Sequence, residues 1–394
     1  MNIEIPDYVQ NLITELEEND YEAYVVGGAI RSALLHVEIH DYDLTTNALP
    51  QEMKQVFQKY RTIETGIQHG TLTVVSDHNP VEITTYRTDK SYLDHRHPDA
   101  VTFTRSLEED CKRRDFTINA LCYNKKTGLK DFFHGLDDLQ NKTLRCIGDP
   151  DKRFDEDALR ILRALRFAAR LNFTIEENTA QAIYKNKALL DVISKERIHE
   201  ELNGLLQAHD IKDTFLNYKD VFAQIIPAIK EYTPEQYAAA VEDMQKAENI
   251  SNVRMALFLQ FLSDPRSVLN DLKYSNADTK TILILLKTKK VSVQNKAETK
   301  YFLKDYEPWM DDILAYHNAK GENTTRWKTY IKEIKDKQEP YTLKQLAVTG
   351  KDLKQIGLKG KEIKETLDSL LQKVIEEKIP NTKEALLQNL KSIQ

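Results

Sequence analysis

The chain has 394 residues, more than one hydrophobic core usually serves, so its length predicts about two to four domains. Hydrophobic residues make up 41% and charged residues 30% of the sequence, which is typical of a soluble globular protein and excludes a disordered chain. The formal net charge of −6 gives no overall attraction to polyanions, so nucleic-acid binding would require a local basic surface. No stretch approaches the roughly 18 uninterrupted apolar residues of a membrane helix, and the start is acidic; we therefore expect a cytoplasmic protein without membrane contact.

The first 140 residues alternate short β-type runs with helical stretches. The β-type runs are YEAYVV, TLTVV, VEITTYR and AVTFT, and the helical stretches include PQEMKQVFQKY and SLEEDCKRR. From about Asp155 onward the apolar spacing is almost entirely helical. This pattern predicts a multidomain α+β protein in which an α/β domain precedes an all-α part. Polar breaks near residues 207–213 and 299–308 are the best candidate boundaries inside the helical part.

The last part of the chain is locally basic. Residues 320–394 contain 16 lysines and arginines against 11 aspartates and glutamates, a surplus of five positive charges in an acidic chain. This surplus predicts either a surface for nucleic acid or an ordinary solvated helix surface.

A pair of glycines follows the first β-type run and precedes an apolar helical segment. Gly27 and Gly28 are followed by Arg31, so strand, glycines and helix come in direct succession. Glycines let backbone N–H groups approach a phosphate at the positive end of a helix, and an arginine adds a charge-assisted contact. The motif predicts a triphosphate site, with a tight turn that binds no ligand as the alternative.

Two carboxylates follow ten residues later, at Asp41 and Asp43. In a strand, residues i and i+2 point to the same side, and hard oxygen ligands so placed suit two magnesium ions that bridge nucleotide phosphates. The combination of the glycine pair with this motif resembles the nucleotidyltransferase superfamily of DNA polymerase β. That resemblance implies a third carboxylate on a later strand, for which Glu82 in VEITTYR is the match; an exposed edge-strand position is the alternative.

Two longer motifs narrow the resemblance. RRDFTINA at residues 113–120 and EDALRILRALRF at residues 156–167 look like motifs of bacterial class II tRNA nucleotidyltransferases, the CCA-adding enzymes, and of their poly(A) polymerase relatives. The order of HGTLTVV, YLDHRHP, GDPDKRF and LAVTGKDL extends the resemblance over the whole chain, in the Gram-positive type. It implies a polymerase β-like catalytic head at residues 1–145, a helical neck at 146–207, a helical body at 208–300 and a tRNA-binding tail at 301–394.

The second motif predicts a base-reading edge. Asp157 and Arg160 stand at i and i+3, so on one helix they would lie on one face. A carboxylate accepts from the exocyclic amine of cytosine or adenine, and a guanidinium donates to the neighbouring ring nitrogen. Uracil and guanine present a carbonyl at that position and would be rejected. A simple intrahelical salt bridge is the alternative.

The remaining arginines of these motifs are expected at the nucleotide. Arg163 would clamp its phosphates, whereas Arg166 would hold Asp157, the tRNA backbone or a structural contact. Arg114 would contact the nucleotide, and Asp115 would fix the arginines around it; metal binding by Asp115 is the less favoured option.

Three local features qualify the resemblance. Residues 87–98 are polar with little periodicity and are expected to form a mobile loop, which in the family helps the site to switch from CTP to ATP. Ser32 stands where the family usually has an aspartate, so how Arg31 is held is left open. His36 stands where a glycine is frequent, which leaves open a glycine-type helix end.

The resemblance implies an enzyme that adds C, C and A to the 3′ end of tRNA from CTP and ATP with Mg²⁺. A partial CC-adding or A-adding enzyme, a poly(A) polymerase and a catalytically silent RNA-binding scaffold are the alternatives. Whether the protein forms a homodimer is left open.

Overall fold

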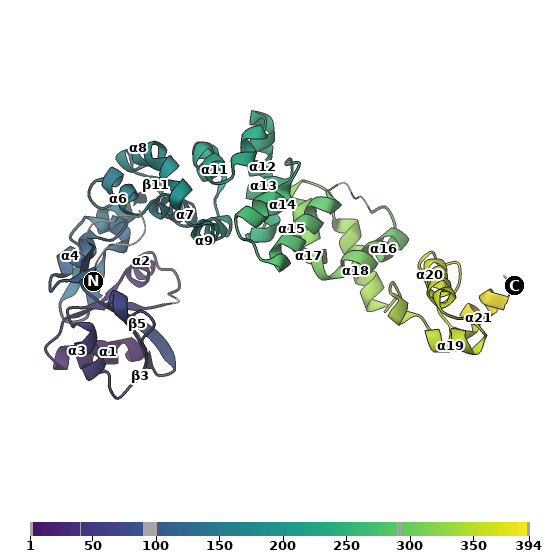
Figure 1. Cartoon of the computed structure of the whole chain (residues 1–394), viewed down its shortest axis with the longest axis horizontal. Coiled ribbons are helices and arrows are strands. Elements are labelled where there is room, and N and C mark those ends of the chain that lie inside the picture. The colour runs from purple at the N-terminus through teal and green to yellow at the C-terminus, as the bar shows by residue number, and fades with distance from the viewer. Residues whose placement is uncertain (1–2, 40, 90–100, 290, 292, 392–394) are drawn as a thin grey trace. The chain divides into compact units, whose positions relative to one another are not determined.

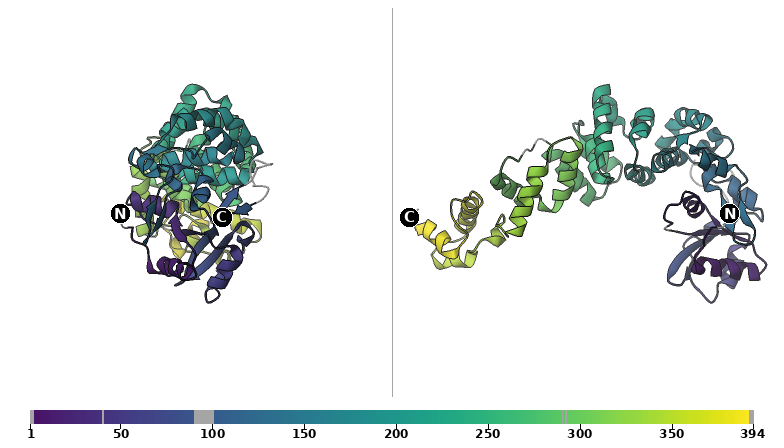
Figure 2. Two further views of the ribbon diagram at one scale, coloured as in Figure 1. Left: turned by 90° about the vertical axis from the view of Figure 1, so that its left-hand side faces the viewer. Right: turned by 180° about the vertical axis from the view of Figure 1, so that it is seen from behind.

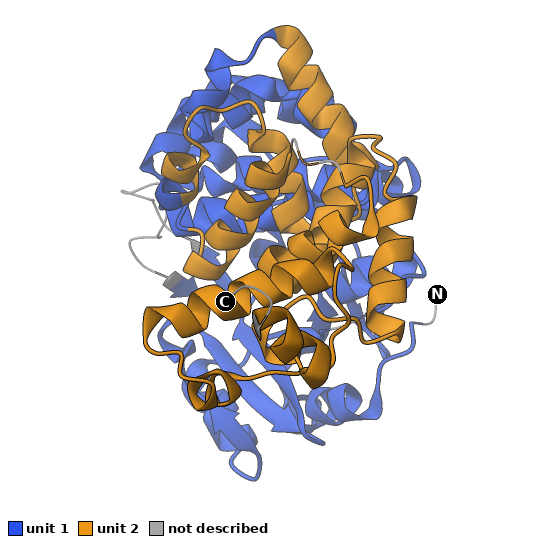
Figure 3. Cartoon of the chain, turned by 90° about the vertical axis from the view of Figure 1, so that its right-hand side faces the viewer, with its two compact units in different colours: residues 1–233, 270–273 blue, residues 234–269, 274–394 orange. Residues whose placement is uncertain are grey.

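The computed structural model describes residues 3–39, 41–89, 101–289, 291 and 293–391. Strands are concentrated in the N-terminal third, and the rest of the chain is helical (Figure 1). The predicted α+β head followed by an all-α part is therefore confirmed. The chain divides into two compact units, one of residues 1–233 with 270–273 and one of residues 234–269 with 274–394 (Figure 3).

A seven-stranded sheet forms the centre of the head. Its strands pair antiparallel except β2 and β5, which run parallel to each other. In order across the sheet the strands are β3 (Arg61–Ile63), β4 (Thr71–Ser76), β5 (Asn79–Thr85), β2 (Asp43–Thr46), β1 (Ala23–Val26), β8 (Cys122–Asn124) and β9 (Gly128–Lys130). The run predicted as YEAYVV contains β1, and the runs TLTVV and VEITTYR overlap most of β4 and β5. All four residues of β1 are buried, which fits its uninterrupted apolar sequence in the middle of the sheet.

Short helices surround this sheet. The first of them lies against the sheet (Figure 2). It buries Val9, Leu12, Ile13 and Leu16, which form an i, i+3, i+4, i+7 stripe. The helices of the head are α1 (Asp7–Glu18), α2 (Gly28–Leu34), α3 (Pro50–Val56), α4 (Leu107–Lys112) and α5 (Gly135–Gln140). A separate two-stranded sheet joins β6 (Arg87–Asp89) to β7 (Val101–Phe103).

Helices complete the first unit after the head. They are α6 (Pro150–Glu156), α7 (Leu159–Leu171), α8 (Glu177–Asn186), α9 (Lys195–Leu206), α10 (Lys212–Asn217) and α11 (Lys219–Ile225). A short parallel pair, β10 (Thr143–Leu144) and β11 (Thr174–Ile175), ties the end of the head to the segment after α7. Since α7 also packs against α9, the arginines of its sequence are brought next to the side chains of α9.

The second unit is helical throughout its described residues. Its helices are α12 (Pro234–Lys246), α13 (Ser251–Leu259), α14 (Pro265–Asp271, whose last two residues belong to the first unit), α15 (Asn276–Thr288), α16 (Lys296–Tyr306), α17 (Met310–Ala319), α18 (Thr325–Asp336), α19 (Gly350–Gln355), α20 (Lys361–Ile375) and α21 (Lys383–Lys391). Most of the polar stretch at 299–308, which we named as a candidate boundary, lies inside α16, so the chain does not break between helices over most of it. The break at 207–213 does separate α9 from α10. The division into four parts stays a prediction.

Among the described residues, no helix is long and apolar enough to cross a membrane.

Candidate active site

A tight turn connects β1 to α2 at the glycine pair. Gly27 has a φ of 68°, a backbone conformation that side chains disfavour, and α2 begins at Gly28. A Cβ atom at Gly27 would lie 3.7 Å from Nη1 of Arg114, so the turn passes directly beside the RRD motif. The two segments that the sequence predicted to hold a nucleotide therefore meet at this turn.

Ser32 and His36, the two departures from the family pattern, lie in α2 and just after its end. His36 adopts a φ of 55°, so this residue makes the left-handed helix end that a glycine makes elsewhere. Arg31 donates from Nη1 to Oδ1 of Asn119 and lies 5.0 Å from the centre of the Phe167 ring. Asn119 and Phe167 thus contact the arginine in this chain.

The predicted carboxylates lie at the edge of one cleft. Asp43 opens β2 and is directly paired with Glu82 on β5, as expected for the third carboxylate. Asp41 precedes the strand, so strand alternation does not fix its side chain as we had predicted, although it lines the same cleft as Asp43. Desolvation raises the pKa of Asp43, and the neighbouring charges of Glu82 and Asp41 raise it further, against the opposing effect of Arg114.

These carboxylates fit a divalent metal that is completed by its substrate. Among the residues that the structure describes, no three His, Cys, Asp or Glu side chains form a metal cage by themselves. Mg²⁺ is usually held by one or two carboxylates together with substrate phosphates. Two carboxylates without further protein ligands are therefore sufficient for such a site.

Asp115 anchors an arginine of the cleft. Its Oδ2 accepts from Nε and Nη2 of Arg163 at 2.9 and 2.6 Å, and its Oδ1 accepts from Nδ2 of Asn119 at 3.0 Å. Although burial opposes the charged form, Arg163 and Asn119 lower the pKa of Asp115 to about 2. Asn119 in turn accepts a hydrogen bond from Arg31. Asp115 therefore positions Arg163 directly and Arg31 through Asn119, in line with the prediction that it fixes the arginines around it.

A second anchoring carboxylate, Asp110 on α4, was not singled out from the sequence. It is completely buried and accepts from Nε and Nη2 of Arg113 at 3.0 and 2.8 Å and from Nη2 of Arg114 at 3.2 Å. It also accepts from the hydroxyl of Thr45 and the backbone N–H of Arg87. Burial works against ionisation, yet the two arginines lower the pKa of Asp110. The i, i+3 and i, i+4 spacing in SLEEDCKRR was the signal that could have identified it.

The predicted helical face of Asp157 and Arg160 is wrong. Asp157 has an extended backbone (φ −146°, ψ 101°) between α6 and α7, and its Oδ1 accepts from the N–H of Leu159, the first residue of α7. Its Oδ2 pairs with Nη2 of Arg197 on α9 at 2.8 Å. Arg160 instead donates to Oε2 of Glu156 at 2.6 Å. The simple salt bridge between Asp157 and Arg160 does not form, and both residues line the cleft separately.

Three arginines surround one aromatic ring inside the cleft. The guanidinium carbons of Arg31, Arg163 and Arg166 lie 5.0, 5.4 and 4.6 Å from the ring centre of Phe167. Burial and the neighbouring arginines lower the pKa of Arg31 to about 10, although Asp115 acts in the opposite direction.

Arg166 is held from α9. It pairs with Oε2 of Glu201 at 2.6 Å, so Glu201 is its partner and Asp157 is not. Gly204, one turn further along α9, makes room for it, because a Cβ atom there would lie 2.7 Å from Cδ of Arg166. Glu201 and Arg197 were both missed in the sequence.

The cleft that these residues line measures about 730 Å³ and lies within the first unit. Eight arginines and four aspartates line it, together with the glycine pair, Leu159, Phe167 and Asn119: Arg31, Arg113, Arg114, Arg160, Arg163, Arg166, Arg170 and Arg197, with Asp41, Asp43, Asp115 and Asp157. All of the predicted site residues except Glu82 line this cleft, and Glu82 is paired beside it. Such an excess of guanidinium groups suits a polyphosphate. Of the predicted mobile loop, residues 90–98 lie outside the described residues.

Family models match three parts of the chain. The family described as "Poly A polymerase head domain" matches residues 23–145, "Probable RNA and SrmB- binding site of polymerase A" matches residues 172–232, and "tRNA nucleotidyltransferase domain 2 putative" matches residues 245–390. The fold and the arginine-lined cleft with its paired carboxylates therefore define a nucleotidyltransferase.

Full-length relatives specify the family. A CCA-adding enzyme of Ligilactobacillus salivarius (strain UCC118) is 36% identical over 99% of this chain and 98% of the relative, and one of Enterococcus faecalis (strain ATCC 700802 / V583) is 36% identical over 95% and 93%. The crystal structure of the Bacillus stearothermophilus CCA-adding enzyme in complex with CTP is 28% identical, with a TM-score of 0.81 over 98% of this chain and 99% of that chain. The chain belongs to the family of CCA-adding enzymes.

Proposed function

We propose that this chain adds C, C and A to the 3′ end of tRNA, from CTP and ATP and without a nucleic-acid template. The observation that carries the proposal is the single cleft in which eight arginines adjoin the carboxylates Asp41 and Asp43. A triphosphate bound by the arginines would place its α-phosphate near these carboxylates. The family of the chain and the solved complex of a relative with CTP support the same assignment.

The residues of the cleft divide the work of phosphate transfer. Arg31, Arg114, Arg163 and Arg166 bind and orient the triphosphate and stabilise the charge that develops on the leaving pyrophosphate, while the turn at Gly28 lets the backbone approach. Asp41 and Asp43 would hold Mg²⁺, with Glu82 beside them. When bound, the metal supplies Lewis-acid polarisation of the α-phosphate and lowers the pKa of the attacking 3′-hydroxyl. The 3′ oxygen bonds to the α-phosphorus as the bond to pyrophosphate breaks.

Asp157 and Arg160 are proposed to read the base. Asp157 is fixed by Arg197 and by the start of α7, and Arg160 is fixed by Glu156, so both side chains face the cleft in set orientations. A fixed carboxylate accepts from the amine that cytosine and adenine share, and a guanidinium donates to the adjacent ring nitrogen. Selection of C and A then follows from protein groups alone.

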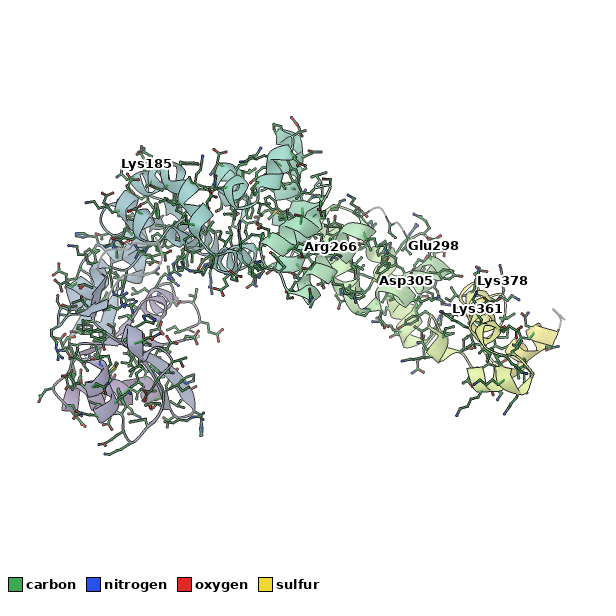
Figure 4. The ribbon with its side chains drawn as sticks, viewed as in Figure 1. Lys185, Arg266, Glu298, Asp305, Lys361 and Lys378 are labelled. Carbon is green, nitrogen blue, oxygen red and sulfur yellow. The ribbon has the colours of Figure 1, made fainter. Side chains whose placement is uncertain are left out.

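The basic tail at residues 301–394 is proposed to bind the tRNA backbone. Lys359, Lys361 and Lys364 are exposed at the start of α20, and Lys378 follows its end. Figure 4 labels two of these lysines, Lys361 and Lys378. Phosphate contacts carry no sequence information, which suits a surface that must accept every tRNA. The head at 1–145, neck at 146–207 and body at 208–300 complete the proposed division.

One assay tests this function. The purified protein is incubated with Mg²⁺ and a tRNA that lacks CCA, with labelled CTP alone, ATP alone or both, and products are resolved at one-nucleotide resolution. We expect two additions from CTP and a third only when ATP is also present. Stopping at two with both nucleotides would indicate a CC-adding enzyme, and a ladder from ATP alone would indicate a poly(A) polymerase. An Asp43→Asn variant serves as the control for contaminating activity.

A further inference from the structure

Most arginines of the cleft are paired with carboxylates that do not belong to the D-x-D motif. Six of the eight form an ion pair with a described carboxylate, and five carboxylates receive them: Asp110, Asp115, Glu156, Asp157 and Glu201. No described cation forms an ion pair with Asp41 or Asp43. The cleft therefore keeps its arginines on one set of carboxylates and leaves another set without such a partner.

This separation matters because arginine and Mg²⁺ compete for the same ligands. A guanidinium forms a strong, often bidentate, pair with a carboxylate. A carboxylate so paired has lost the negative charge and the oxygen lone pairs that a divalent metal requires. An arginine close to the D-x-D motif must therefore be held elsewhere if the motif is to bind a metal.

Arg114 is the arginine whose charge acts on the motif. A Cβ atom at Gly27 would lie 3.7 Å from its Nη1, and Gly27 follows Val26, the residue directly paired with Asp43 between β1 and β2. Although burial and the charge of Glu82 raise the pKa of Asp43, Arg114 acts in the opposite direction. The guanidinium of Arg114 is thus within electrostatic reach of Asp43.

Asp110 is the carboxylate that holds Arg114. Its Oδ2 accepts from Nη2 of Arg114 at 3.2 Å and from the hydroxyl of Thr45, which lies two residues after Asp43 on the same face of β2. Nε of Arg114 is buried and has no hydrogen-bond partner among the described residues, where the pair with Asp110 is its one ion pair. Asp110 is itself completely buried on α4, and Arg113 occupies its other oxygen.

We propose that Asp110 is a positioning residue for the metal site, because it holds Arg114 away from Asp43 and so keeps both carboxylates of the D-x-D motif available to Mg²⁺. This inference rests on the proposed function, in which Asp41 and Asp43 hold the metal. Without the charge of Asp110, the guanidinium would be released and would pair with Asp43. Asp110 thus controls metal affinity through the placement of one arginine.

A purely structural role for Asp110 is the alternative, since a buried carboxylate that receives two arginines also stabilises the fold. The two roles differ in the effect of a second substitution. If a released Arg114 weakens metal binding, removing that arginine as well restores the metal affinity. If loosened packing weakens metal binding, removing the arginine as well does not restore it.

Mn²⁺ binding by the full-length protein, without nucleotide or tRNA, tests the proposal. Electron paramagnetic resonance measures the free ion from micromolar to millimolar concentration, and binding to other carboxylates is subtracted with a variant that combines Asp41→Asn and Asp43→Asn. We expect Asp110→Asn to weaken Mn²⁺ affinity by about tenfold, because a full positive charge would move next to the motif. The variant that combines Asp110→Asn with Arg114→Gln should return to within about twofold of wild type.

Asp138→Asn is the matched control. Asp138 is a buried aspartate of the head that accepts from Arg145 and from the hydroxyl of Thr117, and it does not line the cleft. This variant should bind Mn²⁺ as wild type does. Unchanged affinity in Asp110→Asn, equal weakening in Asp138→Asn, or a double variant as weak as Asp110→Asn alone would overturn the inference.

Arg114→Gln alone decides the question if melting curves show that Asp110→Asn does not fold. Without this guanidinium nothing competes with the ion at Asp43, so Mn²⁺ affinity should equal or exceed that of wild type. A weaker affinity would show that Arg114 supports the metal site, which contradicts the proposal.

The inference and the proposed function fail separately in these experiments. If the wild-type protein adds C, C and A but Asp110→Asn binds Mn²⁺ equally well, only the role of Asp110 is wrong. The same holds if an active wild-type protein binds no more Mn²⁺ than the variant without the two carboxylates, because the motif would then not be available to the ion. If the wild-type protein adds no nucleotide to any tRNA, the proposed function itself is wrong.

Discussion

Asp43 on β2 lies directly opposite Glu82 on β5, because these two strands run parallel in register at the middle of the head sheet. Like charges on adjacent strands favour the protonated form of each other. Desolvation is the largest cause of the raised pKa of Asp43, with the charge of Glu82 next.

The charge of Glu82 should therefore be visible in the titration of Asp43. In metal-free protein, Glu82→Gln removes the neighbouring negative charge, so the pKa of Asp43 should fall. Carboxyl-carbon NMR of selectively labelled protein measures it. The control is Glu64→Gln. Glu64 is an exposed glutamate of the head that pairs with Lys54 and does not line the cleft. An unshifted Asp43 in Glu82→Gln would contradict the pairing.

Asp115→Asn should weaken nucleotide use without abolishing it. The neutral amide cannot form the charge-assisted pair with Arg163, so kcat/KM for CTP and ATP should fall about 10- to 100-fold, the loss expected for such a hydrogen bond. Steady-state kinetics with tRNA in excess measures the effect. An Asp137→Asn control, at an exposed position on α5, should behave as wild type. A metal-ligand role would instead shift the Mg²⁺ dependence of the variant.

The same residue should contribute to stability in a defined pH range. Because the pKa of Asp115 is lowered to about 2, its ionised form favours the folded state, and this contribution is fully present above the ordinary aspartate range near 4. It is lost as the pH falls from about 4 toward 2. The difference in melting temperature between wild type and Asp115→Asn should therefore be constant from pH 5 to 7 and shrink in acid. A difference that grows in acid would contradict this assignment.

Asp157→Asn should relax base selection. The amide keeps an oxygen for the start of α7 but adds a donor where the carboxylate only accepts, so UTP and GTP should compete better with CTP and ATP. We expect the ratio of incorrect to correct incorporation to rise about tenfold, the effect of about 1.4 kcal/mol in discrimination. Single-turnover incorporation of each nucleotide measures it. Retained selectivity would show that other groups read the base.

Charge reversal in the tail should affect tRNA alone. Replacing Lys359, Lys361 and Lys364 with glutamate should raise the KM for tRNA, leave that for CTP unchanged and reduce the dependence of tRNA binding on salt. The same assays on Lys185→Glu, an exposed lysine in the first unit, provide the control (Figure 4). Unchanged tRNA affinity would show that these lysines of the tail do not bind the tRNA.

Local sequence was sufficient for β1, β4, β5 and β7 and for most of the cleft, whereas β3, β8 and β9 were not among the predicted runs. The glycine turn, the D-x-D motif, Glu82 and the RRD motif are each placed by a short strand or turn whose pattern is contained in its own residues. The alternation in VEITTYR, for example, exposes Glu82 between the buried Val81 and Ile83.

The sequence could not predict ion pairs between residues that are far apart in the chain and meet only when the helices pack. Arg197 is 40 residues from Asp157, and Glu201 is 35 residues from Arg166, so neither pair has a local signal. The break between α6 and α7 could not be predicted from the sequence for a similar reason. The apolar period of EDALRILRALRF runs through Asp157, whereas in the structure a side-chain cap and an ion pair to α9 stabilise an extended residue there.

In the proposed mechanism, the arginines around Phe167 determine how tightly a nucleotide binds, whereas other side chains determine which nucleotide is used. The guanidinium groups are proposed to bind phosphates, which are the same in every nucleoside triphosphate, while the side chains proposed to read the base lie at a different part of the cleft. Non-cognate triphosphates should then occupy the cleft readily and act as competitive inhibitors. The rate of addition to tRNA should consequently depend on the ratio of CTP and ATP to all nucleoside triphosphates, and less on the absolute concentration of either.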